Sequence, residues 1–184
     1  DTNSVATVAS LEAQDYVTVI TNDAPLHWWR LGTADTGTAA ANRGSAGVAY
    51  SGMYNGALGR YVTGAIVNSS DTAVEFYGGA DQVVITVTGV VIPSNNYAME
   101  AWVQCPSDGH ALRGICGRYN PTVSLGGVAL ATAQDSSYAL FHKNTTTDSL
   151  VSNVHPIGGS YDHVVGQYVR GSGMIYVNGQ CVAG

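Results

Sequence analysis

The carboxylates are the side chains with the clearest chemical potential, and the glutamates among them are few. The chain holds three, Glu12, Glu75 and Glu100. A glycosidase needs two carboxylates that flank the scissile bond, and some glycosidases place both on one strand as Glu-x-Asp-x-x-Glu. That pattern does not occur in the sequence. Because one carboxylate cannot act as both acid and base, we expect Glu100 to be structural and paired with an arginine such as Arg113 or Arg118.

Other catalytic and cofactor signatures are also missing from the sequence. It contains no Gly-x-Ser-x-Gly nucleophile motif, no His-Glu-x-x-His zinc motif and no phosphate-binding loop. His110, His142, His155 and His163 lack the spacing of a zinc site, and His163 is expected to be a packed, hydrogen-bonded strand residue. We therefore predict no catalytic residues, that is, a protein that is not an enzyme.

The cysteines leave the redox compartment open. There are three of them, Cys105, Cys116 and Cys181, and no Cys-x-x-Cys spacing occurs. Cys105 and Cys116 can pair only if their strands are neighbours. Free cysteine is among the most buried residue types, so we expect these residues to behave as small buried hydrophobes.

Composition and charge exclude several classes of protein. The 184 residues predict one domain, and 45% of them are hydrophobic, which is enough for a sizeable core. Only 11% are charged, with 7 Lys and Arg against 13 Asp and Glu for a net charge of −6. A chain without a basic stripe is not expected to bind nucleic acid. The longest apolar stretch, residues 83–92, is interrupted and too short to span a bilayer.

An N-terminal arm over residues 1–24 is expected to precede the main domain. Leu11, Tyr16, Val19 and Ile20 are spaced as one helical face, with Ser10 as a possible N-cap. Pro25 ends this pattern, because the residue before a proline is pushed out of the α region.

After Pro25 the signals are almost all strands and turns, at the spacing of an antiparallel sandwich. The Asn178-Gly179 pair is the strongest hairpin signal, since both residues tolerate positive φ. The predicted strands are residues 26–31, 48–50, 72–77, 82–88, 97–105, 111–119, 127–133, 137–143, 149–154, 161–168, 174–177 and, after the hairpin, 180–182.

The stretch from residue 97 to residue 105 is the clearest of these strands. Its alternation places Met99 and Val103 on one face, and Glu100 and Trp102 on the other. We expect the face that carries Met99 and Val103 to fill the interior.

Four stretches stand out in chain order: PLHWWRLG (25–32), TAVEFYGGADQV (72–83), AMEAWV (98–103) and YDHVVGQYVRGSGMIYVNGQC (161–181). Together they resemble the laminin G-like domains, which are concanavalin A-like jelly rolls. They look most like the versions found in bacteriophage tail and virion-surface proteins and in bacterial surface proteins.

The resemblance implies an all-β fold, an antiparallel two-sheet jelly-roll sandwich over residues 25–184 behind the short helical or extended arm. Members of this family continue past the hairpin at Asn178 with a further closing strand. The resemblance therefore implies a sandwich that is incomplete at Gly184, with an edge to be covered by downstream residues or by a neighbouring chain.

The resemblance also suggests where a ligand would bind. Lectin-like sites combine an aromatic platform with polar loop residues, and we take Trp28, Tyr119 and Asp108 as ligand-binding candidates, with Trp29 as the buried partner of Trp28. No cofactor is required, but the family often holds Ca²⁺ at the rim of the sandwich. The calcium candidates by loop position are Asp81, Asp108 and Asp135.

The expected function is that of a non-enzymatic structural or adhesion module on a virion surface, in a phage tail, fibre or capsid decoration, with a host-surface glycan as a possible ligand. Other virion proteins or symmetry mates are the expected partners, and the protein is expected to be oligomeric. The alternative is a carbohydrate-binding or adhesion module of a secreted bacterial protein. A glycosidase ranks below both, because Glu100 has no partner carboxylate in the sequence pattern.

Overall fold

The computed structural model describes residues 16–79, 81–85, 96–106, 113–119, 127–133, 135–143 and 147–184, with the backbone alone at residues 119, 143, 147 and 148. The chain divides into two compact units, Asp1–Val90 and Val91–Gly184. The predicted boundary between residues 24 and 25 stays a prediction. The proposed N-cap Ser10 and the first face residue Leu11 lie outside the described residues.

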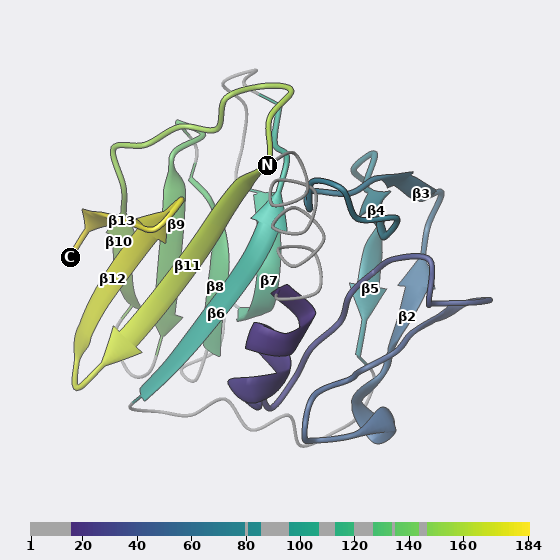
Figure 1. Ribbon diagram of the computed structural model, residues 1–184. Coiled ribbons are helices and arrows are strands. Elements are labelled where there is room, and N and C mark those ends of the chain that lie inside the picture. Colours follow the sequence, from purple (N-terminus) through teal and green to yellow (C-terminus); the bar gives the residue numbers. More distant parts are fainter. Residues whose placement is uncertain are drawn as a thin grey trace, which may run out of the picture. The chain divides into compact units, whose positions relative to one another are not determined.

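The first unit contains a helix and two small antiparallel sheets (Figure 1). The helix covers residues 16–22, buries Ile20 and leaves Val19 exposed. No helix in the described ranges is long and apolar enough to cross a membrane. One sheet has the order β1-β2-β5 and the other pairs β3 with β4. These strands are β1 (Ala39–Ala40), β2 (Gly52–Asn55), β3 (Gly59–Thr63), β4 (Thr72–Glu75) and β5 (Gln82–Val84).

Two strands predicted in this unit are wrong. In place of a strand over residues 26–31 there is one isolated bridge, between Trp29 and Asn42. The backbone N–H of Trp28 instead donates to the Asn42 side chain, at 2.8 Å, so a polar side chain 14 residues away replaces a strand partner. Residues 48–50 form a 3₁₀ turn, η1 (Val48–Tyr50), which starts after Gly47 at a φ of 78°.

The second unit is built from two four-stranded antiparallel sheets. In Figure 1, β6, β11 and β12 lie side by side, and the full order of this sheet is β13-β12-β11-β6. Tight turns with positive φ at Arg170-Gly171 and at Asn178-Gly179 connect β11 to β12 and β12 to β13, the latter as predicted. The strands are β6 (Asn96–Val103), β11 (Asp162–Val169), β12 (Ser172–Val177) and β13 (Gln180–Ala183).

The opposing sheet has the order β10-β9-β8-β7, so that each described strand pairs with its neighbour in the sequence. A register shift between Gly114 and Cys116 interrupts the pairing of β7 with β8. The strands are β7 (Arg113–Tyr119), β8 (Gly127–Thr132), β9 (Tyr138–Lys143) and β10 (Thr147–Val151).

The core of the second unit lies between its two sheets. Met99 and Val103 pack against this core, whereas Glu100 and Trp102 are exposed on the outer face of β6, as the alternation predicts. The predicted all-β antiparallel sandwich is therefore confirmed. The buried core residues are Leu130, Tyr138 and Leu140 from one sheet, and Val164, Ile175 and Val177 from the other.

Candidate functional site

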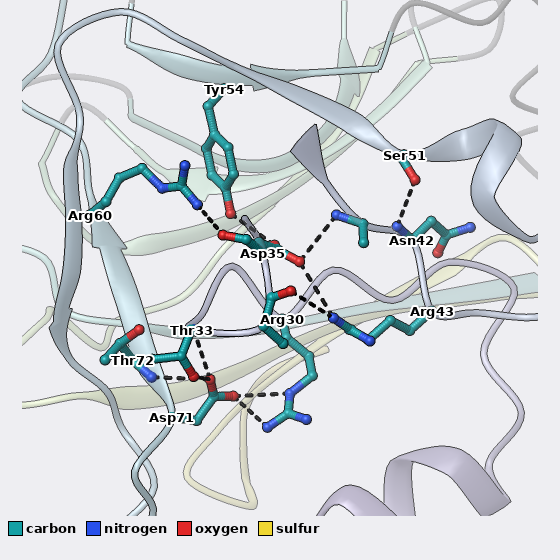
Figure 2. A network of polar contacts seen from close by, with 12 residues as sticks. Arg30, Thr33, Asp35, Asn42, Arg43, Ser51, Tyr54, Arg60, Asp71 and Thr72 are labelled. Atoms are coloured by element: carbon teal, nitrogen blue, oxygen red, sulfur yellow. Dashed lines mark hydrogen bonds and ion pairs between the residues drawn. The ribbon is translucent and has the colours of Figure 1, made fainter. Parts of the chain in front are cut away.

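A buried carboxylate organises the polar network of the first unit (Figure 2). The Asp35 side chain is fully buried, and its Oδ2 accepts a 2.9 Å hydrogen bond from the Tyr54 hydroxyl. Its Oδ1 lies 3.6 Å from a guanidinium nitrogen of Arg43. Burial and the bond to Asp35 raise the pKa of Tyr54 above its ordinary value, so this hydroxyl stays protonated and keeps donating.

Arg60 fastens the loop that carries Asp35. Its guanidinium lies 4.1 Å from the centre of the Tyr54 ring, and it donates to the backbone carbonyls of Asp35, at 2.6 Å, and Gly37. A bulge in β3 allows this approach, because Tyr61 adopts a φ of 64° and the register shifts between Arg60 and Val62. The loop is therefore held by charge-assisted bonds from a neighbouring strand.

A second ion pair lies beside Asp35 in Figure 2. Arg30 donates from Nε and Nη2 to one oxygen of Asp71, at 2.9 and 2.5 Å. The other oxygen accepts from the backbone N–H of Thr33, at 3.3 Å, and of Thr72, at 3.1 Å. A Cβ at Gly32 would stand 2.1 Å from this carboxylate, so the position requires glycine.

The ligand candidate Trp28 lies next to this ion pair. The Arg30 guanidinium is 5.9 Å from the centre of the Trp28 ring. Trp28 and Trp29 are both half-buried, so the expectation that only Trp29 is buried is wrong. The Trp29 indole donates to the carbonyl of Tyr50, at 3.0 Å, and its ring stacks on His27, whose pKa is lowered by burial.

The remaining predicted ligand and calcium residues are described only in part. Asp108 lies outside the described residues, as does the side chain of Tyr119. Asp81 accepts the backbone N–H groups of Ala57 and Tyr77, both at 2.9 Å, and so braces a turn.

Asp135 accepts from the hydroxyl and the backbone N–H of Ser137, which lower its pKa. Calcium takes six to eight oxygen ligands. Within the part of the chain that the structure describes, no three His, Cys, Asp or Glu side chains gather around one point. Asp81 and Asp135 thus each brace a local turn, and a calcium ion at either residue stays a prediction.

The outer face of β6 and β11 carries a third arrangement. Glu100 Oε2 lies 3.5 Å from His163 Nε2, so Glu100 lies against His163 and not against the predicted Arg113 or Arg118. The Trp102 ring stacks on the His163 ring, with centroids 4.9 Å apart. Trp102 and His163 are direct cross-strand partners. An aromatic ring and a carboxylate are thus held side by side by one imidazole.

A second carboxylate of this sheet, Asp162, points into the sandwich, on the side opposite to Glu100. Its oxygens accept from the Tyr138 hydroxyl, at 2.7 Å, and from the side-chain amide of Asn178, at 2.8 Å, and the residue is buried. Because successive strand residues point to opposite faces, Asp162 and the outward Glu100 lie on different sides of the sheet. Among the described strand side chains of this sheet, Glu100 has no carboxylate partner on its own face.

Sequence reasoning did not select Trp102 or His163 as site residues. A signal for Trp102 was present, since the alternation in β6 already sets it outward next to Glu100. No local signal identifies His163, because its contact with Trp102 arises from the pairing of β6 with β11, which are distant in the sequence.

Comparison with known proteins gives one match. The family model described as the concanavalin A-like lectin/glucanases superfamily matches residues 77–184, more than half of the chain. This range contains the second unit and its two sheets. No curated protein and no solved structure matches the chain.

Proposed function

This chain belongs to the concanavalin A-like lectin/glucanase superfamily, and from that premise we propose that it binds carbohydrate as an adhesion-type module and does not cleave it. The superfamily contains both binding proteins and hydrolases, so the choice between them depends on the residues of the site and not on the fold.

The observation that carries the proposal is the outer face of β6, where Trp102 and Glu100 stand side by side next to His163. A flat indole ring offers an apolar surface to the C–H face of a sugar, and a carboxylate accepts hydrogen bonds from its hydroxyl groups. Both side chains are more than one-third exposed, so a ligand can reach them.

A role without cleavage is supported by Glu100, which is the one carboxylate on the outer face of the described strands of its sheet. Retaining glycosidases hold two carboxyl groups about 5–5.5 Å apart and inverting ones about 6.5–9.5 Å apart across the bond. Glu100 instead has the His163 imidazole as its neighbour, and Asp162 is buried on the other face of the sheet. The described strands of this sheet therefore present one carboxylate to a ligand.

The test is a glycan array followed by an assay for new reducing ends with each glycan that binds. We expect at least one glycan to bind and none to be cleaved. Failure of every glycan to bind would overturn the binding role. Release of reducing ends that is abolished by Glu100→Gln would overturn the non-catalytic part.

The setting of the module is proposed as a virion surface, or an extracellular surface in the alternative of a secreted bacterial protein. Its support is the sequence resemblance together with the low charge of the chain, in which only 11% of residues are charged. The virion setting predicts an assembly of several copies, or a tight complex with another virion protein, whereas a secreted module is expected to be monomeric. Light scattering of the purified protein and the protein content of purified particles separate the two settings.

A further inference from the structure

The outward side chains of β6, β11, β12 and β13 are aligned in rows across the sheet. Each row follows from the antiparallel register, because directly paired residues point to the same face. One row holds Trp102 and His163. The next row holds Glu100, Val165, Tyr176 and Cys181, and a third holds Ala98, Gln167 and Met174.

These rows give a platform with aromatic and polar groups in reach of one another. Trp102 and Glu100 are two residues apart on β6, and Tyr176 belongs to the same row as Glu100, with Val165 between them. The interposed Val165 is shorter than either aromatic side chain. An extended sugar chain can therefore contact the indole ring and reach polar groups of the neighbouring row.

His163 lies against both Trp102 and Glu100. Its ring lies against Trp102 with an angle of 27° between the ring planes, and its Nε2 is 3.5 Å from the carboxylate of Glu100. This nitrogen is shielded from solvent and has no hydrogen-bond partner. His163 is less exposed than Glu100, 25% against 43% of the side chain, so the histidine acts as a support and the carboxylate is the group offered to a ligand.

The charge of this face restricts the kind of ligand. In the sequences of the four strands the ionisable acidic and basic residues are Glu100, Asp162 and His163, and Asp162 points inward. No lysine or arginine lies in these strands. The face is thus neutral apart from one negative group, on a chain with a net charge of −6. An acidic glycan would meet repulsion without a compensating lysine or arginine from these strands.

We propose that the outer face of β6 and β11, with Trp102 and Glu100 as contact residues beside His163, binds oligosaccharides without acidic groups and rejects sialylated and sulfated ones. This inference rests on the proposed carbohydrate-binding function and adds to it the site and the charge class of the ligand.

The experiment uses the full chain on an array that carries neutral, amine-bearing and acidic oligosaccharides. The strongest neutral binder is then titrated calorimetrically at low and at high salt. We expect binding to a neutral glycan with an affinity that salt does not change, since no ion pair forms with the ligand. Trp102→Ala is expected to weaken this binding by at least about tenfold, as for a central aromatic contact. Glu100→Gln should weaken it less, because the amide keeps an acceptor oxygen.

Phe76→Ala is the matched control, because it removes an exposed aromatic ring from the first unit. It should bind as the wild type does. Circular dichroism and thermal melting confirm folding of each variant. If Trp102→Ala does not fold, Trp102→Leu replaces it, since leucine is apolar but offers no flat ring.

The outcomes separate this inference from the function on which it rests. Glycan binding that Trp102→Ala and Trp102→Leu leave unchanged would overturn the site but keep the function. Preferential binding of acidic glycans, or an affinity for the neutral glycan that falls steeply with salt, would overturn the charge class. Binding of no glycan at all would overturn the proposed function itself.

Discussion

The hydroxyl of Tyr138 donates a 2.7 Å hydrogen bond to the carboxylate of Asp162 inside the sandwich, and so ties β9 of one sheet to β11 of the other. The second oxygen of Asp162 accepts from Asn178, so the same carboxylate also holds the turn between β12 and β13. Tyr138 is fully buried and belongs to the hydrophobic core. One buried polar cluster thus fixes both the spacing of the sheets and the C-terminal hairpin.

Tyr138→Phe removes this bond and leaves the ring in place. Loss of a buried hydrogen bond to a charged group typically costs about 1.5–3 kcal/mol of stability, and we expect that decrease in the free energy of unfolding by denaturant titration. Tyr176→Phe is the control, since the Tyr176 hydroxyl donates a weak hydrogen bond to the sulfur of Met174, at 3.4 Å. Equal stability of the two variants would contradict the structural role of the Tyr138–Asp162 bond.

Alkaline pH should destabilise the protein through its buried tyrosines. Burial raises the pKa of Tyr97 and Tyr138 above the ordinary value of 10.0, and the bond to Asp162 adds to the effect at Tyr138. A tyrosine whose folded-state pKa is raised contributes stability that is fully present below the unfolded pKa and is lost as pH rises beyond it. The melting temperature should therefore fall from about pH 10 upward. Tyr138→Phe should show a shallower fall, and an identical pH profile would contradict this explanation.

Gly166 sets how closely the two sheets approach. A Cβ at this position would stand 2.9 Å from Leu140 Cδ1 and 3.2 Å from Leu130 Cδ1, both in the opposing sheet. Gly166→Ala should overpack the core and destabilise the fold by about 1–3 kcal/mol. Gly114→Ala meets nothing within 4 Å and is expected to fold as stably as the wild type. Calorimetric melting of both variants checks this contrast. Equal melting temperatures of Gly166→Ala and Gly114→Ala would refute it.

The three thiols should differ in reactivity. All are free, but Cys181 is exposed, whereas burial raises the pKa of Cys105 and raises that of Cys116 to about 12. Since the thiolate is the reactive form, iodoacetamide at neutral pH should modify Cys181 first and Cys116 only after unfolding. Mass spectrometry of the labelled peptides measures this order, and labelling of Cys116 in the native protein would disprove the buried placement.

Short-range sequence patterns, namely strand alternation and turn residues, predicted the second unit well. Alternation in β6 separates Met99 and Val103 from Glu100 and Trp102, because a strand has a period of two whatever its partners are. The hairpin at Asn178-Gly179 follows from the φ values that these two residues tolerate. Both features depend on a few consecutive residues, so the sequence contains them directly.

The rest depends on contacts between distant residues. The aromatic run over residues 26–31 has strand propensity, yet the Asn42 side chain takes the Trp28 N–H that a strand partner would need. The predicted partner of Glu100 is an arginine, whereas the register of β6 against β11 brings His163 to it. Strand pairing of this kind cannot be derived from the composition of either strand.

The most direct test of the account is an NMR titration of the indole N–H resonances with the neutral oligosaccharide that binds best on the array. The chain has three tryptophans, and single replacements by phenylalanine assign Trp28, Trp29 and Trp102. The account predicts a saturable shift of the Trp102 resonance, while that of Trp29, whose indole is bonded to the Tyr50 carbonyl, does not move. A bound glycan that shifts another indole and leaves Trp102 unchanged would contradict it.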